Sequence, residues 1–491
     1  MYEYFKSLSE NSCCSQSGVC SIHPAISALY DILLYEIRSS VFYLVKMKEF
    51  NILNKNACAQ CLEALSLFLI NTSLNESKYL KIVNNINKIK KDLKEQYIKY
   101  CADNDLPCEI LKTGIEIKEK TTINQLIEFA QINLKTKINA IDKSKQALFE
   151  LVTLYAKLSA SIVQKIKRYE NYDEFDFEIL RFFALTNTYS IRIEKIKRRI
   201  QEFCSTAFKL KQKLFQITKE RYGEKCNAVI STSEYKGHGI LVSGDDLIEL
   251  ELLLKTLDKM QLKDEVNVYT NGSLILAHFY PYFKNNKFLK GHWGVNDVYY
   301  DFSKFSGSIL ITRNFLQKID NLYKGEIYSS KIISFSKMID IKNDNYEPLI
   351  KSALSGQGFL KDNKKPELNI SYDTEKINKE LLDVINNYSE AVLIAGSLDS
   401  KKISQKYQNK KIIYFSTPLE SDLLLNAIEK LSNNNIKITI FFPHCDIESI
   451  YNVFLLLNKD IKIYISACSH IIINPHLINA LKLNFNIEVI D

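Results

Sequence analysis

The sequence predicts a mixed fold: an all-helical N-terminal half, made of two related helical bundles, followed by two parallel-sheet, Rossmann-like α/β domains. Apolar residues recur every three or four positions as far as residue 222. Beyond it, short β-branched runs alternate with helical stretches, as they do in βαβ units. Only 14 Gly and 8 Pro occur in 491 residues, which favours long helices. We therefore expect domains at 1–222, 223–355 and 356–491.

The helical half contains a weak internal repeat. Residues 28–40, ALYDILLYEIRSS, resemble residues 147–161, ALFELVTLYAKLSAS. Further along each copy, LSLFLINT at 65–72 resembles FFALTNT at 182–188. Because the similar segments recur in the same order, we expect two bundles built on one plan.

The second half contains short runs that are apolar on both faces, which is typical of strands buried in a parallel sheet. A polar segment, residues 358–376, separates them into two groups and hence two sheets. The candidate strands are 239–243, 266–270, 308–312 and 331–335 before this segment, and 391–395, 411–416, 437–442, 461–466 and 486–491 after it.

Composition narrows the class of protein. The net charge of +8 comes mainly from Lys residues spread along the chain, so we expect no nucleic-acid partner. The first residues lack the apolar core of a signal peptide, and no run approaches the roughly 18 apolar residues of a membrane span. The 11 Cys follow no disulfide-like spacing. These features predict a cytoplasmic protein with reduced thiols and no membrane partner.

Four blocks in the second half resemble a known family. They are GHGILVSGDDLIEL (237–250), VNVYTNGSLILAHFYP (266–281), FLKGHWG (288–294) and FSKFSGSILITRNF (302–315). In order and spacing they are similar to the blocks G-x-x-ILVSGHDL, INVYTHGEMLPAHAYP, LVGNYG and FAKFPGAILMTTNC of the hybrid-cluster protein (prismane, hydroxylamine reductase) family. The resemblance implies a helical domain, two α/β domains, an N-terminal iron–sulfur cubane, and a hybrid iron–sulfur–oxygen cluster that reduces hydroxylamine or nitric oxide.

The cubane motif of that family is only partly present. Cys14 and Cys20 match the second pair of its four cysteines, whereas the same spacing places Phe5 and Tyr2 at the first pair. Iron–sulfur clusters are held by thiolates, and a phenyl ring supplies no ligand. We interpret Cys14 and Cys20 as the remnant of a metal site, with reduced thiols near the terminus as the alternative.

The resemblance also places the hybrid-cluster ligands, which in the family are one His, two Glu and four Cys. Asp245 takes the position of the His and Ser273 that of the first Glu. Phe315 and Ser397, or the residue after Ser397, take the positions of two Cys, and Cys445 falls near the last Glu. Because alcohols, carboxylates and phenyl rings cannot rebuild a sulfur-rich cluster, the resemblance implies that these ligands are lost.

Several of these residues have structural alternatives. Ser243 and Asp246 have capping-box-like spacing ahead of the helix DLIELELLLKTLDKM, and a capping role is the alternative to metal binding for Asp245. Cys58 and Cys61 have C-x-x-C spacing but lie in an apolar helical pattern, so we interpret them as buried residues.

Three functions stay open. The first is a cluster-less, catalytically inactive paralogue with a binding or regulatory role, which is the function we favour; it needs no cofactor and has no catalytic residues. The second is an active hydroxylamine reductase that holds an iron–sulfur cluster with an atypical ligand set. The third is a small-molecule binder that uses the vacated cavity between the α/β domains. The sequence identifies no partner and leaves open an intact family paralogue or a redox partner.

Overall fold

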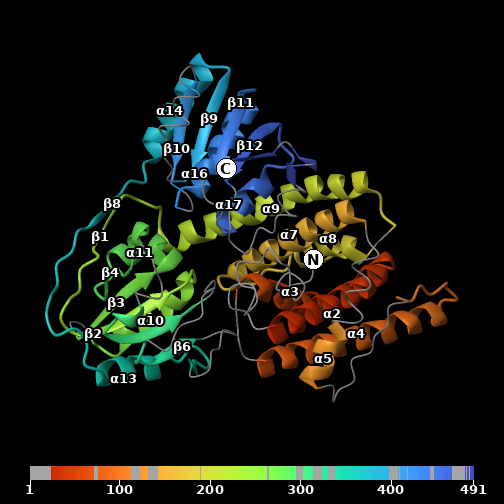
Figure 1. Ribbon diagram of the computed structural model, residues 1–491, viewed down its shortest axis with the longest axis horizontal. Helices are drawn as coiled ribbons and strands as arrows, with labels where there is room; N and C mark the ends of the chain where they lie inside the picture. The colour runs from red at the N-terminus through yellow and green to blue at the C-terminus, as the bar shows by residue number, and fades with distance from the viewer. Residues whose placement is uncertain are drawn as a thin grey trace.

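A computed structural model describes most of the chain. The described residues are 24–70, 76–111, 122–130, 142–187, 190–262, 265–294, 302–312, 323–329, 338–396, 407, 410–416, 419–442, 447–466, 481–482, 484–485 and 487–490. As predicted, helices come first and two parallel sheets follow (Figure 1).

The helical half is a set of long helices around one hydrophobic core. Its elements are α2 (Pro24–Glu49), α3 (Lys55–Ile70), α4 (Glu76–Asp103), α5 (Ile123–Phe129), α7 (Lys143–Lys167), α8 (Asp176–Phe183), η3 (Ala184–Asn187) and α9 (Ile193–Tyr222). The repeat pairs α2 with α7, and α3 with α8. Because α7 packs on α3, α8 and α9, both copies contribute to the same core.

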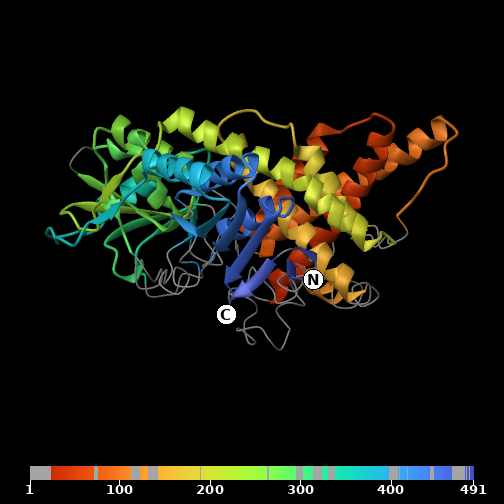
Figure 2. The same ribbon diagram turned by 90° about the horizontal axis from the view of Figure 1, so that it is seen from above.

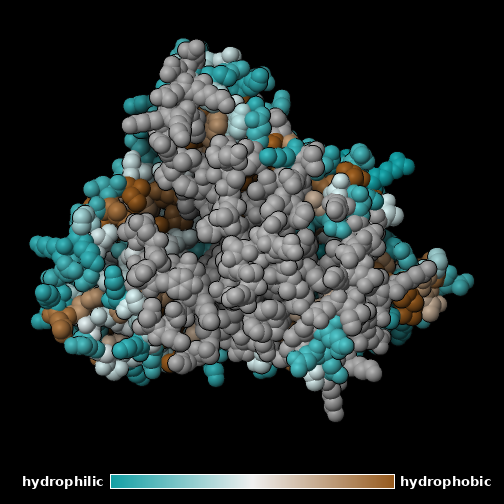
Figure 3. Space-filling model, in the orientation of Figure 1, coloured by the Kyte–Doolittle hydropathy of each residue, from teal (hydrophilic) through white to brown (hydrophobic). Residues whose placement is uncertain are grey.

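The central helix of this half is α7. Its stretch Ser144–Lys167 has the length and hydropathy of a membrane span, but 89% of the apolar part is buried inside the protein. This stretch is therefore a core helix, covered by its neighbours. In Figure 3 the described residues along the outline of the molecule are mostly hydrophilic, with hydrophobic residues only in small groups.

The first α/β region contains a six-stranded parallel sheet in the order β4-β3-β2-β5-β6-β7. This is the strand order of a Rossmann sheet, whose switch point lies between its first and fourth strands, here β2 and β5. The strands are β2 (His238–Ser243), β3 (Val266–Asn271), β4 (Leu289–His292), β5 (Gly307–Ile311), β6 (Ile327–Ser329) and β7 (Met338–Asp340). The helical elements are α10 (Leu247–Lys259), η4 (Gly272–Phe279), α11 (Pro281–Lys284) and α13 (Glu347–Ser355).

The second α/β region contains a five-stranded parallel sheet in the order β10-β9-β11-β12-β13. Its elements are α14 (Thr374–Asn387), β9 (Glu390–Ala395), β10 (Lys411–Phe415), α16 (Ser421–Asn433), β11 (Lys437–Phe442), α17 (Ile447–Leu455), β12 (Ile461–Ser466) and β13 (Ile487–Ile490). An antiparallel ribbon of β1 (Ala228–Ile230) and β8 (Leu368–Ile370) joins the start of the first region to the start of the second.

Most of the predicted strands are confirmed. Eight of the nine candidates coincide with β2, β3, β5, β9, β10, β11, β12 and β13, and the ninth, 331–335, lies outside the described residues. The strands that the sequence did not reveal are β1, β4, β6, β7 and β8, each of three or four residues. Runs this short show too few apolar positions for a period to be recognised.

The two sheets dock on the helical half in different ways. The second region shares the hydrophobic core of the helices, and the ring of Phe454 in α17 stacks on Tyr155 in α7 with centroids 3.6 Å apart. The Cys204 thiol in α9 also donates to the Phe454 carbonyl at 3.1 Å. The first region has two hydrophobic clusters, and the larger one also includes Tyr222 from the end of α9. In Figure 2 the long yellow α9 extends from this green region across to the red and orange helices.

Candidate functional site at the carboxyl end of the first sheet

The positions matched to cluster ligands follow the carboxyl ends of parallel strands. Asp245 comes two residues after the end of β2, Ser273 two after β3, and Phe315 four after β5. In the second sheet, Ser397 comes two residues after β9 and Cys445 three after β11. Ligand sites in such sheets lie at this edge, next to the switch point. Cys14, Cys20, Phe315, Ser397 and Cys445 themselves lie outside the described residues.

Two glycine turns bring positions 245 and 273 onto adjacent loops. Gly244 and Gly272 have φ values of 123° and 65°, which residues other than Gly rarely adopt. A Cβ on Gly272 would lie 3.8 Å from the backbone N and O of Gly244. The two turns are therefore in contact. Ser273 on the second turn is exposed.

The cap of α10 differs from the predicted one. Asp246 is the N-cap, and its carboxylate accepts hydrogen bonds from the amides of Ile248 at 3.0 Å and Glu249 at 3.2 Å. Ser243 ends β2 instead, and its hydroxyl donates to Asn271 at 2.7 Å. The predicted capping box is wrong because the strand continues through Ser243 and the turn needs two further residues before the helix begins.

Asp245 forms an ion pair with the helical half. Its carboxylate lies 2.5 Å from the ammonium of Lys165, in the last turn of α7. The Asp245 side chain is 8% exposed and that of Lys165 29%, so the pair is largely screened from water. Asp245 is therefore neither the cap of α10 nor, in this structure, a carboxylate without a counter-ion.

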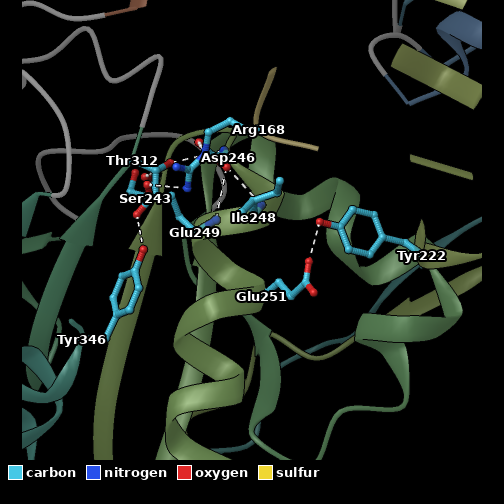
Figure 4. A network of polar contacts seen from close by, with 9 residues as sticks. All are labelled: Arg168, Tyr222, Ser243, Asp246, Ile248, Glu249, Glu251, Thr312 and Tyr346. Carbon is cyan, nitrogen blue, oxygen red and sulfur yellow. Dashed lines mark hydrogen bonds and ion pairs between the residues drawn. The ribbon is translucent and has the colours of Figure 1, made fainter. Parts of the chain in front are cut away.

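Arg168 follows Lys165 at the end of α7 and contacts two more carboxylates (Figure 4). Its guanidinium donates to Glu249 at 3.3 Å and lies 3.8 Å from Asp246. Glu249 is fully buried, and its other oxygen accepts from the Tyr346 hydroxyl at 2.6 Å. Burial lowers the pKa of Arg168, but Asp246 and Glu249 together raise it above its ordinary value. The cation stays charged inside the interface.

A second group of ion pairs holds the next turn of α10. Arg221, near the end of α9, binds both oxygens of Glu251 at 2.8 and 2.9 Å. The Tyr222 hydroxyl donates to Glu251 at 3.0 Å, and Lys255 donates at 2.6 Å. Burial raises the pKa of Glu251, but hydrogen bonds from Arg221 and Lys255 outweigh burial and lower it.

These ion pairs link α7 and α9 to α10 and to the turn before it, and we call them the ion-pair clamp. Its basic residues are Lys165, Arg168 and Arg221, and its acidic residues are Asp245, Asp246, Glu249 and Glu251. Sequence reasoning did not identify the clamp. Its signals were a basic run at a helix end, IVQKIKRYE, and two acidic residues inside an apolar helix, LIELELLL. Neither pattern predicts which residues of opposite charge will pair, because the two segments are about 80 residues apart in the sequence and come together only in the folded protein.

A buried pair of histidines lies beside the same edge. The Thr270 hydroxyl at the end of β3 is 2.9 Å from Nε2 of His278 and 2.8 Å from Nδ1 of His292. Burial lowers the pKa of His278 to about 3 and that of His292 to about 4. Both rings are therefore neutral near pH 7. The Thr270 hydroxyl can donate its one proton to only one of the two ring nitrogens, so the other ring donates an N–H to the Thr270 oxygen.

The predicted burial of Cys58 and Cys61 is confirmed. Both thiols lie in the helical core, and burial raises the pKa of Cys58 to about 12 and that of Cys61 still further. Across the part of the chain that the structure describes, no three His, Cys, Asp or Glu side chains are grouped so that they could hold a metal ion.

Comparison with known proteins decides the family. The family model of the Prismane/CO dehydrogenase family matches residues 8–474. The chain belongs to this family. A hydroxylamine reductase of Methanocella arvoryzae (strain DSM 22066 / NBRC 105507 / MRE50) is 25% identical to this prismane-family protein over 413 residues, which cover 80% of the chain and 73% of the relative.

Family membership corrects one expectation. We expected no cofactor, and this is wrong, because the prismane family and the hydroxylamine reductase relative point to iron–sulfur clusters as the cofactors. The two matched positions that the structure describes do not fit such a cluster by themselves. Asp245 and Ser273 supply oxygen, whereas clusters of this kind are held mainly by thiolates, and Asp245 is already paired with Lys165.

Proposed function

We propose that this prismane-family protein has lost the hydroxylamine reductase reaction of its relative and has a binding or regulatory role. The observation that supports this proposal is the ion pair between Asp245 and Lys165 at 2.5 Å. A histidine that binds a metal offers a neutral ring nitrogen. Here the matched residue is a carboxylate whose charge is neutralised by an ammonium group from another part of the fold.

The surroundings of Asp245 support the same proposal. The neighbouring carboxylates of Asp246 and Glu249 face Arg168, and the amide of Asp246 donates to the hydroxyl of Thr312 at 3.4 Å. Thr312, which follows β5, also donates to the carbonyl of Ser243 at 3.0 Å. Thr312 thus joins the end of β5 to the turn after β2, and Arg168 joins that turn and α10 to the end of α7. We propose a cytoplasmic location, in keeping with the composition.

The second candidate is an active hydroxylamine reductase with an atypical ligand set. It is favoured by the family match over residues 8–474 and by the strand-end placement of the matched positions. It differs from the first candidate in one measurable property, which is turnover of hydroxylamine.

The test is an activity assay on protein purified without oxygen from cells supplied with iron. Hydroxylamine reduction by a reduced viologen dye is measured beside the Methanocella relative, and iron and acid-labile sulfide are measured in the same samples. We expect the rate per cluster to be roughly 100-fold or more below that of the relative. Even a mutation of a residue that only supports a metal ligand lowers activity about 10- to 100-fold. A rate per cluster equal to that of the relative would establish the second candidate.

A matched pair of variants locates the cause. Asp245→His restores the residue type of the family, and Lys165→Met removes only the counter-ion of Asp245. If position 245 limits the reaction, Asp245→His raises the rate and Lys165→Met does not. No change in either variant would place the limitation at other matched positions.

A further inference from the structure

The loop after α4 folds back on the last turns of that helix. The Leu106 amide donates to the Cys101 carbonyl at 2.9 Å, and the Glu109 amide donates to the Tyr97 hydroxyl at 3.2 Å. The Glu109 carboxylate also pairs with Lys46 of α2 at 2.8 Å. These contacts fix both ends of the loop, so residue 108 lies over the helical turn that carries Tyr97 and Cys101.

Two cysteines lie close to each other where the loop covers the helix. Cys101 is 1% exposed on the inner side of α4, whereas Cys108 lies in the exposed run of residues 102–110. The two backbone hydrogen bonds of the loop place Cys108 beside Tyr97 and Cys101, and both neighbours affect the pKa of its thiol. This arrangement differs from that of Cys58 and Cys61, which are both buried within one helix. Among the cysteines that the structure describes, this pair combines a thiol that solvent reaches with a buried thiol beside it.

We propose that Cys101 and Cys108 form a redox-active dithiol, which a small-molecule disulfide such as oxidised glutathione converts to an intramolecular disulfide. The Cys108 thiolate attacks one sulfur of the glutathione disulfide, whose S–S bond breaks and releases one glutathione thiolate. The Cys101 thiolate then attacks the Cys108 sulfur of the mixed disulfide and releases the second. The protein loses two electrons and two protons, and one oxidised glutathione becomes two reduced glutathione molecules.

The geometry suits this division of roles. The exposed thiol can be reached by the oxidant, and the buried thiol can be reached only by Cys108. A disulfide needs the two Cα atoms within roughly 4.4–6.8 Å, and the loop that folds back on the turn of Cys101 can bring Cys108 into this range by a local movement. Desolvation and the neighbouring Cys101 raise the pKa of Cys108. Since only the thiolate attacks, the rate of oxidation should increase about tenfold from pH 7 to pH 8.

The experiment treats the native full-length protein with oxidised glutathione, blocks free thiols, and maps its tryptic peptides by mass spectrometry. Residues 100–112, YCADNDLPCEILK, form one tryptic peptide that contains both cysteines. We expect this peptide to lose two hydrogen atoms without keeping glutathione, and to recover them in excess reduced glutathione. Cys226 is alone in its peptide, residues 226–236, and serves as the internal control that can only form an adduct.

Two variants assign the roles. Cys101→Ala should keep glutathione on Cys108, because the resolving thiol is missing, whereas Cys108→Ser should leave Cys101 unmodified. Since Cys108 is exposed, Cys108→Ser does not depend on core packing. The proposal is overturned if the native wild-type peptide stays a dithiol or retains a stable glutathione adduct. It is also overturned if the urea-unfolded chain forms the disulfide at the same rate, because the fold would then contribute nothing.

Discussion

The two α/β regions are attached to the same helices by different mixtures of apolar and charged contacts. The second region buries α17 in the helical core, with Phe454 stacked on Tyr155. The first region takes only Tyr222 of α9 into its larger hydrophobic cluster, and its helix α10 is held to the helical half by the ion-pair clamp. Apolar burial is non-directional and tolerates sequence drift, whereas a buried ion pair requires both partners in place. Asp245, which the sequence resemblance matched to a His of the family, belongs to the charged interface.

The largest expected effect comes from breaking the apolar interface. Phe454→Ala should lower the free energy of unfolding by about 3–5 kcal/mol, because it removes a fully buried ring and leaves a cavity beside Tyr155. Chemical denaturation measures the change. Leu382→Ala in the same region is the control; its side chain is 58% exposed, and the change should stay within about 0.5 kcal/mol. Equal effects of the two substitutions would mean that α17 is not part of the helical core.

The charged interface should be nearly as sensitive at one point. Arg168→Met leaves the fully buried Glu249 without its cation and should cost about 3 kcal/mol. Adding Glu249→Gln should recover part of this loss, since the unpaired charge is then removed. Arg181→Met is the matched control, because Arg181 pairs with Glu178 at 3.0 Å on the surface, where such pairs contribute about 0–1 kcal/mol. A full loss in the double variant would assign the effect to packing.

Acid should act first on the region that contains the histidine pair. His278 and His292 have pKa values of about 3 and 4 when folded, below the 6.5 of a free histidine. The two histidines destabilise the folded state only below about pH 6.5. As the pH falls further, the unfolded chain binds more protons than the folded one, and the free energy of unfolding decreases. Each histidine should lower the free energy of unfolding by about 2 kcal/mol at pH 5 relative to pH 7.

Hydrogen exchange by region, measured at pH 7 and pH 5 and corrected for intrinsic rates, checks this expectation. The first α/β region should open more readily at pH 5 than the second. His278→Gln should reduce the difference in opening free energy between pH 7 and pH 5 by about half, because one of the two histidines remains. Equal loss of protection in both sheets would contradict the assignment to this pair.

The smallest effect is expected for an exposed ion pair that also joins the helical half to the first region. Lys78 of α4 lies 2.8 Å from Asp340 of β7, and both side chains are partly exposed. Lys78→Met should change the free energy of unfolding by about 0.5 kcal/mol or less, because water screens the pair. A loss comparable to that of Arg168→Met would mean that burial does not distinguish the contacts of this interface.

The sequence by itself determined the order of elements and the strands of the second sheet. Runs such as 391–395 and 437–442 are apolar on both faces, and that pattern is local, so it needs no knowledge of the partner strands. The family blocks also placed Asp245 and Ser273 after two strands that turn out to be neighbours. The short strands β6 and β7 carry too few residues to give such a pattern.

Only the tertiary structure decided what the matched residues contact. Asp245 pairs with Lys165, and Asp246, not Ser243 or Asp245, is the N-cap of α10. A loop that folds back on α4 places Cys108 beside Cys101. Each of these pairings depends on where an element ends and how it packs on another. A sequence fixes which charges and thiols exist, whereas the free energy of a pair depends on the distance and the burial that packing imposes.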